Sequence, residues 1–360
     1  MASPSSDLTD FVAAMGGERS LRVEENLGEG FVRLRVAEAE RRQAKHDIQC
    51  IEDAVVEMLR NSRDAGARRI FVATSREGDR RIVTILDDGF GIPADMQERV
   101  FDARVTSKLE SMHMDRWGVH GRGMALYSVR ENCESARVVD SAPGKGTVIQ
   151  VVSDTTSLPE KTDQSTWPSL GKDDDGEQVV SRGPHNIVRA CCEFALEERG
   201  VCEVYVGSPS EMVATIRRRV RPSVDGSNLL FVDDLTELPA LERFSVAADA
   251  RELLGVCMGV GIDLSERTAH RILSGQIRPV RSALSHLTHK ASSDSPREVD
   301  LQRDRRGLRL SREDADEFSR IMERDFSFLA DRYYLSLAQD PKVRVSRGRV
   351  TVTFEVSEGD

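Results

Sequence analysis

"EMLRNSRDAGA", residues 57–67, places two different stripes of side chains on one predicted helix. Apolar and small residues recur from Ile51 onward at the spacing of a buried helix face, and a glycine ends the pattern. Glu57, Asn61 and Asp64 stand four and three residues apart, so they share another face of the same helix. An acid, an amide and a second acid beside a core-facing stripe indicate a ligand site on this helix.

The segments around this helix predict the fold class. After the helix, the pattern alternates between strands and helices in the order strand, strand, short helix, glycine-rich connector, helix, strand, strand. The segments are "RRIFVATSR" (68–76), "RIVTILDDG" (81–89), "PADMQERVF" (93–101), "MALYSVRENC" (124–133), "ARVVDS" (136–141) and "GTVIQVVS" (146–153). This order predicts an α+β fold, a two-layer α/β sandwich in which helices cover one face of a sheet.

Composition divides the rest of the chain. We expect residues 1–153 to form this domain with an N-terminal arm, and the Ser-, Asp- and Gly-rich segment 154–183 to be a linker or a long surface loop. We expect residues 184–360 to be a mixed α/β, helix-rich region. Its predicted elements are helices at 185–200 and 210–220, strands at 201–207 and 228–234, mostly helical segments at 248–290 and 311–338, and a hairpin around residues 347–348.

Bulk properties narrow the class of protein. A length of 360 residues suggests two domains, and 39% hydrophobic with 31% charged residues is ordinary globular composition. The net charge of -10 argues against nucleic-acid binding over the whole surface, although a local basic patch is compatible with it. The six cysteines form no CxxC pair, which argues against zinc. The absence of a signal-peptide pattern and of a long apolar run predicts a cytoplasmic protein outside the membrane.

Three further motifs combine with the polar helix face. In "LDDGFGIP" (86–93) a predicted strand ends in an acid, which can accept a hydrogen bond from an exocyclic amine. In "WGVHGRGMAL" (117–126) glycines precede a helix, where free backbone amides can bind phosphate. "GKGTV" (144–148) leads a threonine into a strand. An amide oxygen suits magnesium, and a nearby carboxylate can activate water. Each motif alone is also typical of a plain turn, loop or solvated helix.

In this order across residues 48–153, the four motifs resemble the GHKL ATPase superfamily of gyrase B, heat-shock chaperone, histidine-kinase and MutL-type mismatch-repair ATPases. "RNSRDAGA" (60–67) and "TSK" (106–108) are most similar to MutL-like proteins. The resemblance implies ATP and Mg²⁺ as ligands. It implies that Glu57 is the general base and that Asn61 is the magnesium ligand.

The same resemblance assigns the nucleotide-binding residues. Asp87 is expected to bond the adenine amine, supported by Thr147. The remaining positions implied in binding are Asp64, Ala65, Gly89, Gly91, Ile92, Lys108, Gly118, Gly121, Arg122, Gly123 and Met124. Asp88 departs from the family pattern, which often has Asn there, and we expect this extra acid to face solvent.

These expectations lead to an ATP-binding protein, a Mg²⁺-dependent ATPase acting as a conformational switch. Two alternatives stay open: a protein kinase of the anti-sigma or histidine-kinase type, and a non-catalytic ATP sensor coupled to a DNA- or partner-binding module. ATP binding is expected to favour a homodimer. "GIDLSERTAHRILSG" (261–275) resembles the outline of a helix-turn-helix, with Arg267 and Arg271 on one face, so residues 256–290 are a candidate DNA- or protein-binding segment.

Overall fold

The computed structural model describes most of the chain in two compact units, Met1–Ala291 and Ser292–Asp360. The described residues are 23–36, 38–106, 113–115, 118–120, 123–173, 176–223, 234–292, and, within 318–358, residues 318–319, 321–323, 326, 330, 335–346 and 349–358.

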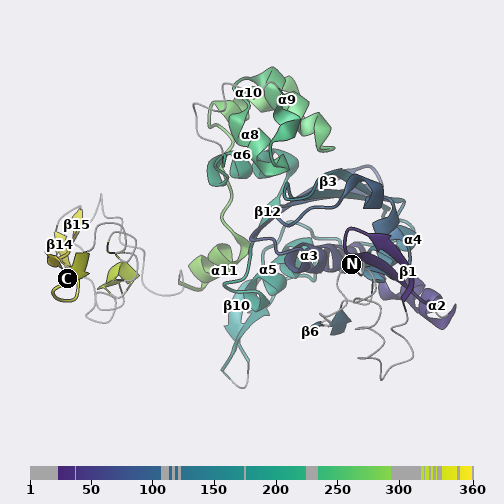
Figure 1. The fold of residues 1–360 in the computed structure, drawn as a ribbon, viewed down its shortest axis with the longest axis horizontal. Helices are drawn as coiled ribbons and strands as arrows, with labels where there is room; N and C mark the ends of the chain where they lie inside the picture. Colours follow the sequence, from purple (N-terminus) through teal and green to yellow (C-terminus); the bar gives the residue numbers. More distant parts are fainter. Residues whose placement is uncertain are drawn as a thin grey trace, which may run out of the picture. The chain divides into compact units, whose positions relative to one another are not determined.

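A five-stranded sheet in the order β12-β3-β4-β9-β8 forms the centre of the first unit (Figure 1). Its strands are β3 (Arg69–Glu77), β4 (Arg80–Asp87), β8 (Ser135–Ser141), β9 (Thr147–Asp154) and β12 (Glu203–Gly207). β3, β4, β9 and β8 pair antiparallel, whereas β12 pairs parallel with β3. In this register Asp87 stands at the end of a central strand, between Ile70 and Thr147.

Helices cover one face of this sheet and carry the opening motif. They are α2 (Glu38–Asp47), α3 (Ile51–Asp64), α4 (Ala125–Asn132), α5 (Ile187–Glu197) and α11 (Ala283–Ser292). α3 begins where the Asp53 carboxylate accepts a hydrogen bond from the Cys50 amide, and Gly66 follows its end at a φ of 72°. Met58 and Leu59 of α3 are buried in one cluster with sheet residues such as Ile85. The predicted helix and its buried stripe are confirmed.

A second group of helices covers the opposite face, as Figure 1 shows. It consists of α6 (Pro209–Arg219), the 3₁₀ turn η3 (Leu235–Glu237), α8 (Ala240–Val246), α9 (Ala250–Gly259) and α10 (Glu266–Leu273). Phe71 and Tyr205 stack on this side with ring centroids 4.9 Å apart, in one buried cluster with Phe244 of α8. The expected α/β sandwich is confirmed, and it carries this additional helical layer.

The first unit therefore extends beyond the boundary at residue 153 that composition suggested. β12 adds a parallel strand at the β3 edge, and α5 packs beside α3. Residues 154–183 are part of the same unit: Leu158 is buried in the core, and the segment contains the hairpin β10 (Ser169–Lys172) and β11 (Gln178–Ser181). Glu52 of α3 accepts hydrogen bonds from this segment's Lys161 amide and Gln164 side chain.

Smaller elements complete the described chain. They are β1 (Val23–Gly28), β2 (Phe31–Leu34) and β5 (Val105–Thr106) in one sheet, the 3₁₀ turns η1 (Ala94–Met96) and η2 (Arg99–Phe101), and the pair β6 (His113–Asp115) and β7 (Gly118–His120). In the second unit, β14 (Lys342–Ser346) and β15 (Arg349–Thr353) form the predicted hairpin. β13 (Leu335–Leu337) pairs with β16 (Val356–Glu358) in the same unit. β13 lies within residues 311–338, which were expected to be mostly helical.

The predicted strand at 228–234 lies almost entirely outside the described residues. Among the described helices, none combines the length and apolarity that a bilayer crossing requires.

Phe194 of α5 provides a test of the shared core. Its side chain is fully buried, so replacing it with alanine removes a large apolar group from beneath the sheet. We expect Phe194→Ala to lower the free energy of unfolding by about 3–5 kcal/mol in urea denaturation followed by circular dichroism. Val201→Ala is the control, because Val201 is 58% exposed and should shift stability by about 0.5 kcal/mol or less. A separate transition for residues 184–291 would contradict one cooperative core.

Candidate functional site

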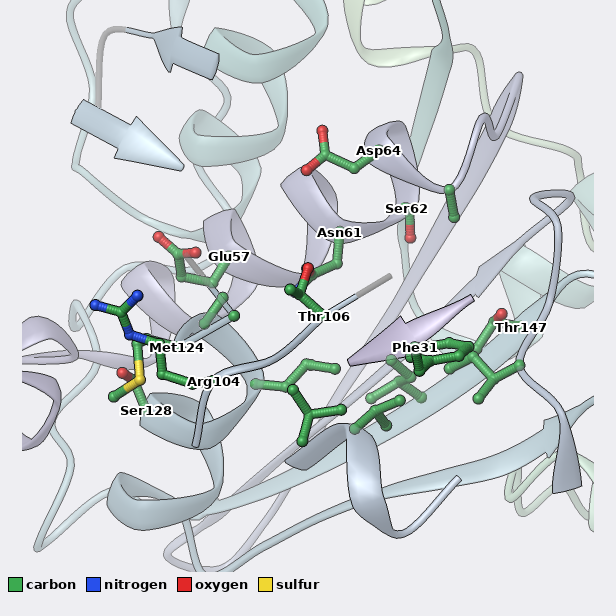
Figure 2. Close-up of a pocket in the computed structure, with 18 of the residues that line it drawn as sticks. Phe31, Glu57, Asn61, Ser62, Asp64, Arg104, Thr106, Met124, Ser128 and Thr147 are labelled. Atoms are coloured by element: carbon green, nitrogen blue, oxygen red, sulfur yellow. The ribbon is translucent and has the colours of Figure 1, made fainter. Parts of the chain in front are cut away.

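A cavity of about 550 Å³ opens between α3, the ends of β4 and β9, and the start of α4 (Figure 2). It brings together residues that are far apart in the sequence. The predicted residues that line it are Glu57, Asn61, Asp64, Ala65, Asp87, Gly91, Ile92, Gly123, Met124 and Thr147. Its size lies within the range usual for sites that enclose small organic ligands.

The Asp87 carboxylate lies at the inner wall of the cavity and is 3% exposed. Ser62 of α3 donates its hydroxyl hydrogen to Oδ2 at 2.7 Å, and the Gly89 amide donates to Oδ1 at 2.9 Å. The backbone of Thr147 also hydrogen-bonds the carboxylate. Burial raises the pKa of Asp87 to about 6, although these hydrogen bonds oppose the shift. The group is therefore mainly ionised at neutral pH and held by donors from three segments.

Close backbone contacts around Asp87 explain two of the glycines. Gly146 adopts a φ of 78°, and a Cβ atom there would collide with the Asp87 carbonyl oxygen. Gly91 also has a φ of 78°, and its Cβ atom would collide with the Ala142 carbonyl. Ser141 connects the loop after β4 to the start of β9, because its hydroxyl accepts from the Ile92 amide at 2.7 Å and donates to the Gly146 carbonyl at 2.9 Å. The turn 142–146 can thus lie directly against the loop that follows β4.

The two acids on the polar face of α3 line the cavity and also contact neighbouring arginines. Glu57 forms an ion pair with the buried Arg60 at 2.7 Å. Asp64 receives a hydrogen bond from Arg63 at 2.9 Å. In Figure 2, Glu57, Asn61 and Asp64 succeed one another along α3. The predicted stripe is therefore real, and its first acid has an arginine partner within the helix.

Asn61 differs from these acids because its amide is buried without full hydrogen bonding. Its Nδ2 atom has no hydrogen-bond partner among the residues that the structure describes, and the side chain lines the cavity. A buried amide of this kind is costly unless a ligand satisfies it. Rotation of the amide by half a turn would present the oxygen instead, which is a hard ligand for magnesium.

A metal here would depend on few protein ligands. Within the described ranges, no three His, Cys, Asp or Glu side chains are grouped so that they could hold a metal ion. Magnesium commonly takes one or two protein oxygens and completes its shell with water and substrate phosphate oxygens. The donor set of Asn61 near Glu57 fits that mode of binding.

Arg104 is a cavity residue that sequence reasoning did not identify. It is 2% exposed and has a φ of 63°, unusual for a residue with a side chain. Its amide donates to the Gly123 carbonyl at 2.7 Å, which joins the strand before the glycine-rich connector to the start of α4. In Figure 2 its guanidinium lies on the same side of the cavity as Glu57. Other lining residues that were not foreseen include Phe31, Ser62, Thr106 and Ser128.

Asp88 was expected to face solvent, and that expectation is wrong. Its Oδ1 atom accepts hydrogen bonds from the amides of Arg68 at 2.7 Å and Arg69 at 2.8 Å. Its Oδ2 atom receives the Arg69 side chain at 2.9 Å. This acid therefore fixes the entry into β3, because it satisfies backbone donors that would otherwise be open at the start of the strand.

The remaining predicted residues lie in different parts of the structure or outside its described residues. Gly89 lies behind Asp87, where a Cβ atom would be 2.8 Å from the Ala65 carbonyl oxygen. Gly118 is the first residue of β7 and pairs with Asp115. Lys108, Gly121 and Arg122 lie outside the described residues.

Comparison with known proteins identifies the same region. Residues 46–157 match the family described as "Histidine kinase-, DNA gyrase B-, and HSP90-like ATPase". The DNA mismatch repair protein MutL of Thermus aquaticus is 43% identical over 82 residues, 22% of this chain and 15% of that protein. MutL of Aquifex pyrophilus is 34% identical over 104 residues, 28% of this chain and 24% of that protein. The similarity therefore spans less than a quarter of each of these relatives.

A solved structure, full-length ShkA in complex with AMPPNP, is 14% identical and covers 64% of this chain and 49% of that chain. Its TM-score of 0.22 is too low to establish a shared overall arrangement.

Two glycines of one turn test the close approach to Asp87. Gly144 and Gly146 both have positive φ, but a Cβ atom on Gly144 meets open space, whereas one on Gly146 meets the Asp87 carbonyl. We expect Gly144→Ala to cost about 1–2 kcal/mol through backbone strain alone. Gly146→Ala should cost about 1–3 kcal/mol more, because the turn must also move. Thermal denaturation measures both, and equal losses would show that the contact does not constrain the turn.

Proposed function

Because residues 46–157 form a domain of the histidine kinase-, DNA gyrase B- and HSP90-like ATPase family, we propose that this protein binds ATP with Mg²⁺ and hydrolyses it as a conformational switch. The observation that carries the proposal is the buried Asp87 carboxylate at the wall of a cavity large enough for a nucleotide.

Asp87 provides the recognition of adenine. Its carboxylate accepts three hydrogen bonds, from the Ser62 hydroxyl, the Gly89 amide and the Thr147 backbone, and its two oxygens together have about four lone-pair sites. An exocyclic amine can therefore donate to the carboxylate without displacing Ser62 or Gly89. The low polarity around this buried group strengthens such a hydrogen bond. Thr147 lies next to Asp87 across the strand pair and closes this end of the cavity.

The phosphates would lie towards α4 and the centre of α3. Gly123 has a φ of 68°, and Met124 and Ala125 follow it at the helix start; all three line the cavity. Amides at a helix N-terminus favour anions. Asn61 would hold Mg²⁺, which when bound would neutralise charge on the phosphate oxygens.

Glu57 is assigned as the general base for hydrolysis. A water molecule attacks the γ-phosphorus, a new phosphorus–oxygen bond forms, and the bond to the β–γ bridging oxygen breaks. ADP leaves with that electron pair, and Glu57 accepts a proton from the water. The Arg60 guanidinium lies 2.7 Å from the Glu57 carboxylate and holds that side chain in place on α3.

The turn 142–146 supplies a route from the nucleotide to the second helical layer. On its cavity side it lies against Asp87 through Gly146. On its other side the Lys145 carbonyl accepts from the Ala240 amide at 3.1 Å, at the start of α8. Arg243 of α8 also binds Asp140 of β8 at 2.7 Å. A nucleotide that moves this turn would therefore change the position of α8.

Titration of Asp87 predicts how ATP binding depends on pH. Its pKa of about 6 means that ATP affinity should fall as the pH is lowered through about 6, because the protonated carboxyl loses its charge. Calorimetric titrations over this range measure the effect. Asp87→Asn should bind ATP at least about tenfold more weakly at neutral pH and lack this step. A wild-type profile that matches that of Asp87→Asn would exclude Asp87 as the recognition group.

The same shift predicts a stability change in the free protein. Burial raises the pKa of Asp87 in the folded protein above its ordinary value of 3.8. The neutral carboxyl therefore contributes fully to the free energy of unfolding at pH values below about 3.8. This contribution is lost as the pH rises through about 6. The difference in unfolding free energy between wild type and Asp87→Asn should therefore change across this interval in urea titrations. A difference that is independent of pH would contradict a raised folded pKa.

Replacing Glu57 tests the chemistry separately from binding. We expect Glu57→Gln to keep ATP affinity and to lower the release of labelled phosphate from γ-labelled ATP by about 10²–10⁴-fold. Glu77→Gln, an exposed change at the end of β3, should leave both unchanged. Label transferred to protein would favour the kinase alternative. ATP binding without turnover in the wild type would favour the sensor.

A further inference from the structure

α9 and α10 form two helices joined by a short turn, on the side of the sheet opposite α3. Gly261 in this turn has a φ of 71°, and the Ile262 amide donates to the Cys257 carbonyl at 2.9 Å. Ser265 caps α10, since its hydroxyl accepts from the Thr268 amide at 3.2 Å. The nucleotide chemistry described above does not use these two helices.

The packing of α10 determines which of its faces is outward. Ala269 and Ile272 are buried in one cluster with residues of α6 and α9. Arg267, His270 and Arg271 are exposed, and the two arginines stand one helical turn apart. None of the large exposed apolar side chains of the described chain lies on α10. The outward face of this helix is thus polar and cationic.

The segment after α10 extends this cationic surface. Arg278 and Arg281 are exposed, and the Val280 amide between them donates to the Thr215 hydroxyl of α6 at 2.9 Å. Within the described part of the chain, neither these two arginines nor Arg267 and Arg271 have an ion-pair partner. Residues 264–290 contain five basic residues and one acid, a formal charge of +4 in a chain of net charge -10.

We propose that α10 and the following segment bind double-stranded DNA, with α10 in the major groove and Arg267, Arg271, Arg278 and Arg281 on backbone phosphates. A helix fits the major groove of B-form DNA, and a two-helix unit places its second helix there. Arginine presents a planar fork that matches phosphate oxygens. A protein partner is a poorer match, because the outward face of α10 has none of the large exposed apolar side chains that the centre of a protein interface buries.

Charge reversal on α10 tests the proposal with the full chain in the absence of nucleotide. The measurement is fluorescence anisotropy of a labelled mixed-sequence DNA duplex about three helical turns long, at low ionic strength. We expect Arg267→Glu/Arg271→Glu to bind at least about tenfold more weakly than wild type. The slope of log affinity against log salt should also fall by about two, since each phosphate contact contributes about 0.9.

Matched variants distinguish the loss of the α10 arginines from a change in overall net charge and from a loss of folding. Arg42→Glu/Arg199→Glu changes the formal charge equally at exposed arginines on α2 and after α5, and should alter affinity by about twofold or less. Arg267→Lys/Arg271→Lys should retain most of the affinity, because the charges that meet phosphate remain. Circular dichroism checks that the glutamate variant has the thermal stability of the wild type, and Arg267→Gln/Arg271→Gln replaces it if not.

Several results would overturn the proposal. They are failure of the wild type to bind the duplex, equal weakening by both charge-reversal pairs, and tighter binding of duplex RNA or of single-stranded DNA. The first result would leave the surface to a protein partner. The measurement is made without nucleotide, so its outcome does not depend on the proposed ATP site.

Discussion

A buried charge that must be hydrogen-bonded is the constraint on which the site depends. Asp87 is enclosed at the end of a central strand, and an isolated carboxylate there would be strongly unfavourable. Its donors come from Ser62 on α3, from the Gly89 amide and from the Thr147 backbone. The helix, the loop after β4 and the neighbouring strand must therefore all be in place before this charge is satisfied. Glycine at 146 is required for the same reason, because a side chain there would push the turn away from Asp87.

Burial of the sheet on both faces connects this site to the rest of the first unit. One face supports α3 and the cavity, and the other supports α6, α8, α9 and α10. The turn 142–146 lies between the Asp87 loop and α8, and Arg243 fixes α8 to β8 through Asp140. These packed contacts are the route by which the proposed switch would couple the cavity to the helical layer. The proposed DNA-binding face belongs to that layer, so nucleotide and DNA would act on one continuous unit.

Local patterns predicted the parts of the structure that local interactions determine. The spacing of Glu57 and Asn61 indicated a shared helix face, and the strands, turns and hairpin near it followed from residue type. The parallel pairing of β12 with β3 was not predicted, because register between segments more than a hundred residues apart is absent from any local pattern. The near-continuous apolar run of β4 was the available signal that both sheet faces are buried. Nothing in the sequence around Arg104 distinguishes it from a surface arginine. The role of Asp88 could not be predicted either, because it depends on where the Arg68 and Arg69 amides lie in the folded chain.

Recognition of the adenine amine by the buried Asp87 carboxylate can be tested by changing the base of the nucleotide. Calorimetry with wild-type protein would compare ATP with the purine riboside triphosphate that lacks only the exocyclic amine. A hydrogen bond to a charged group contributes about 1.5–3 kcal/mol, so ATP should bind at least about tenfold more tightly. Equal affinity for the two nucleotides would show that Asp87 makes no hydrogen bond to the adenine amine.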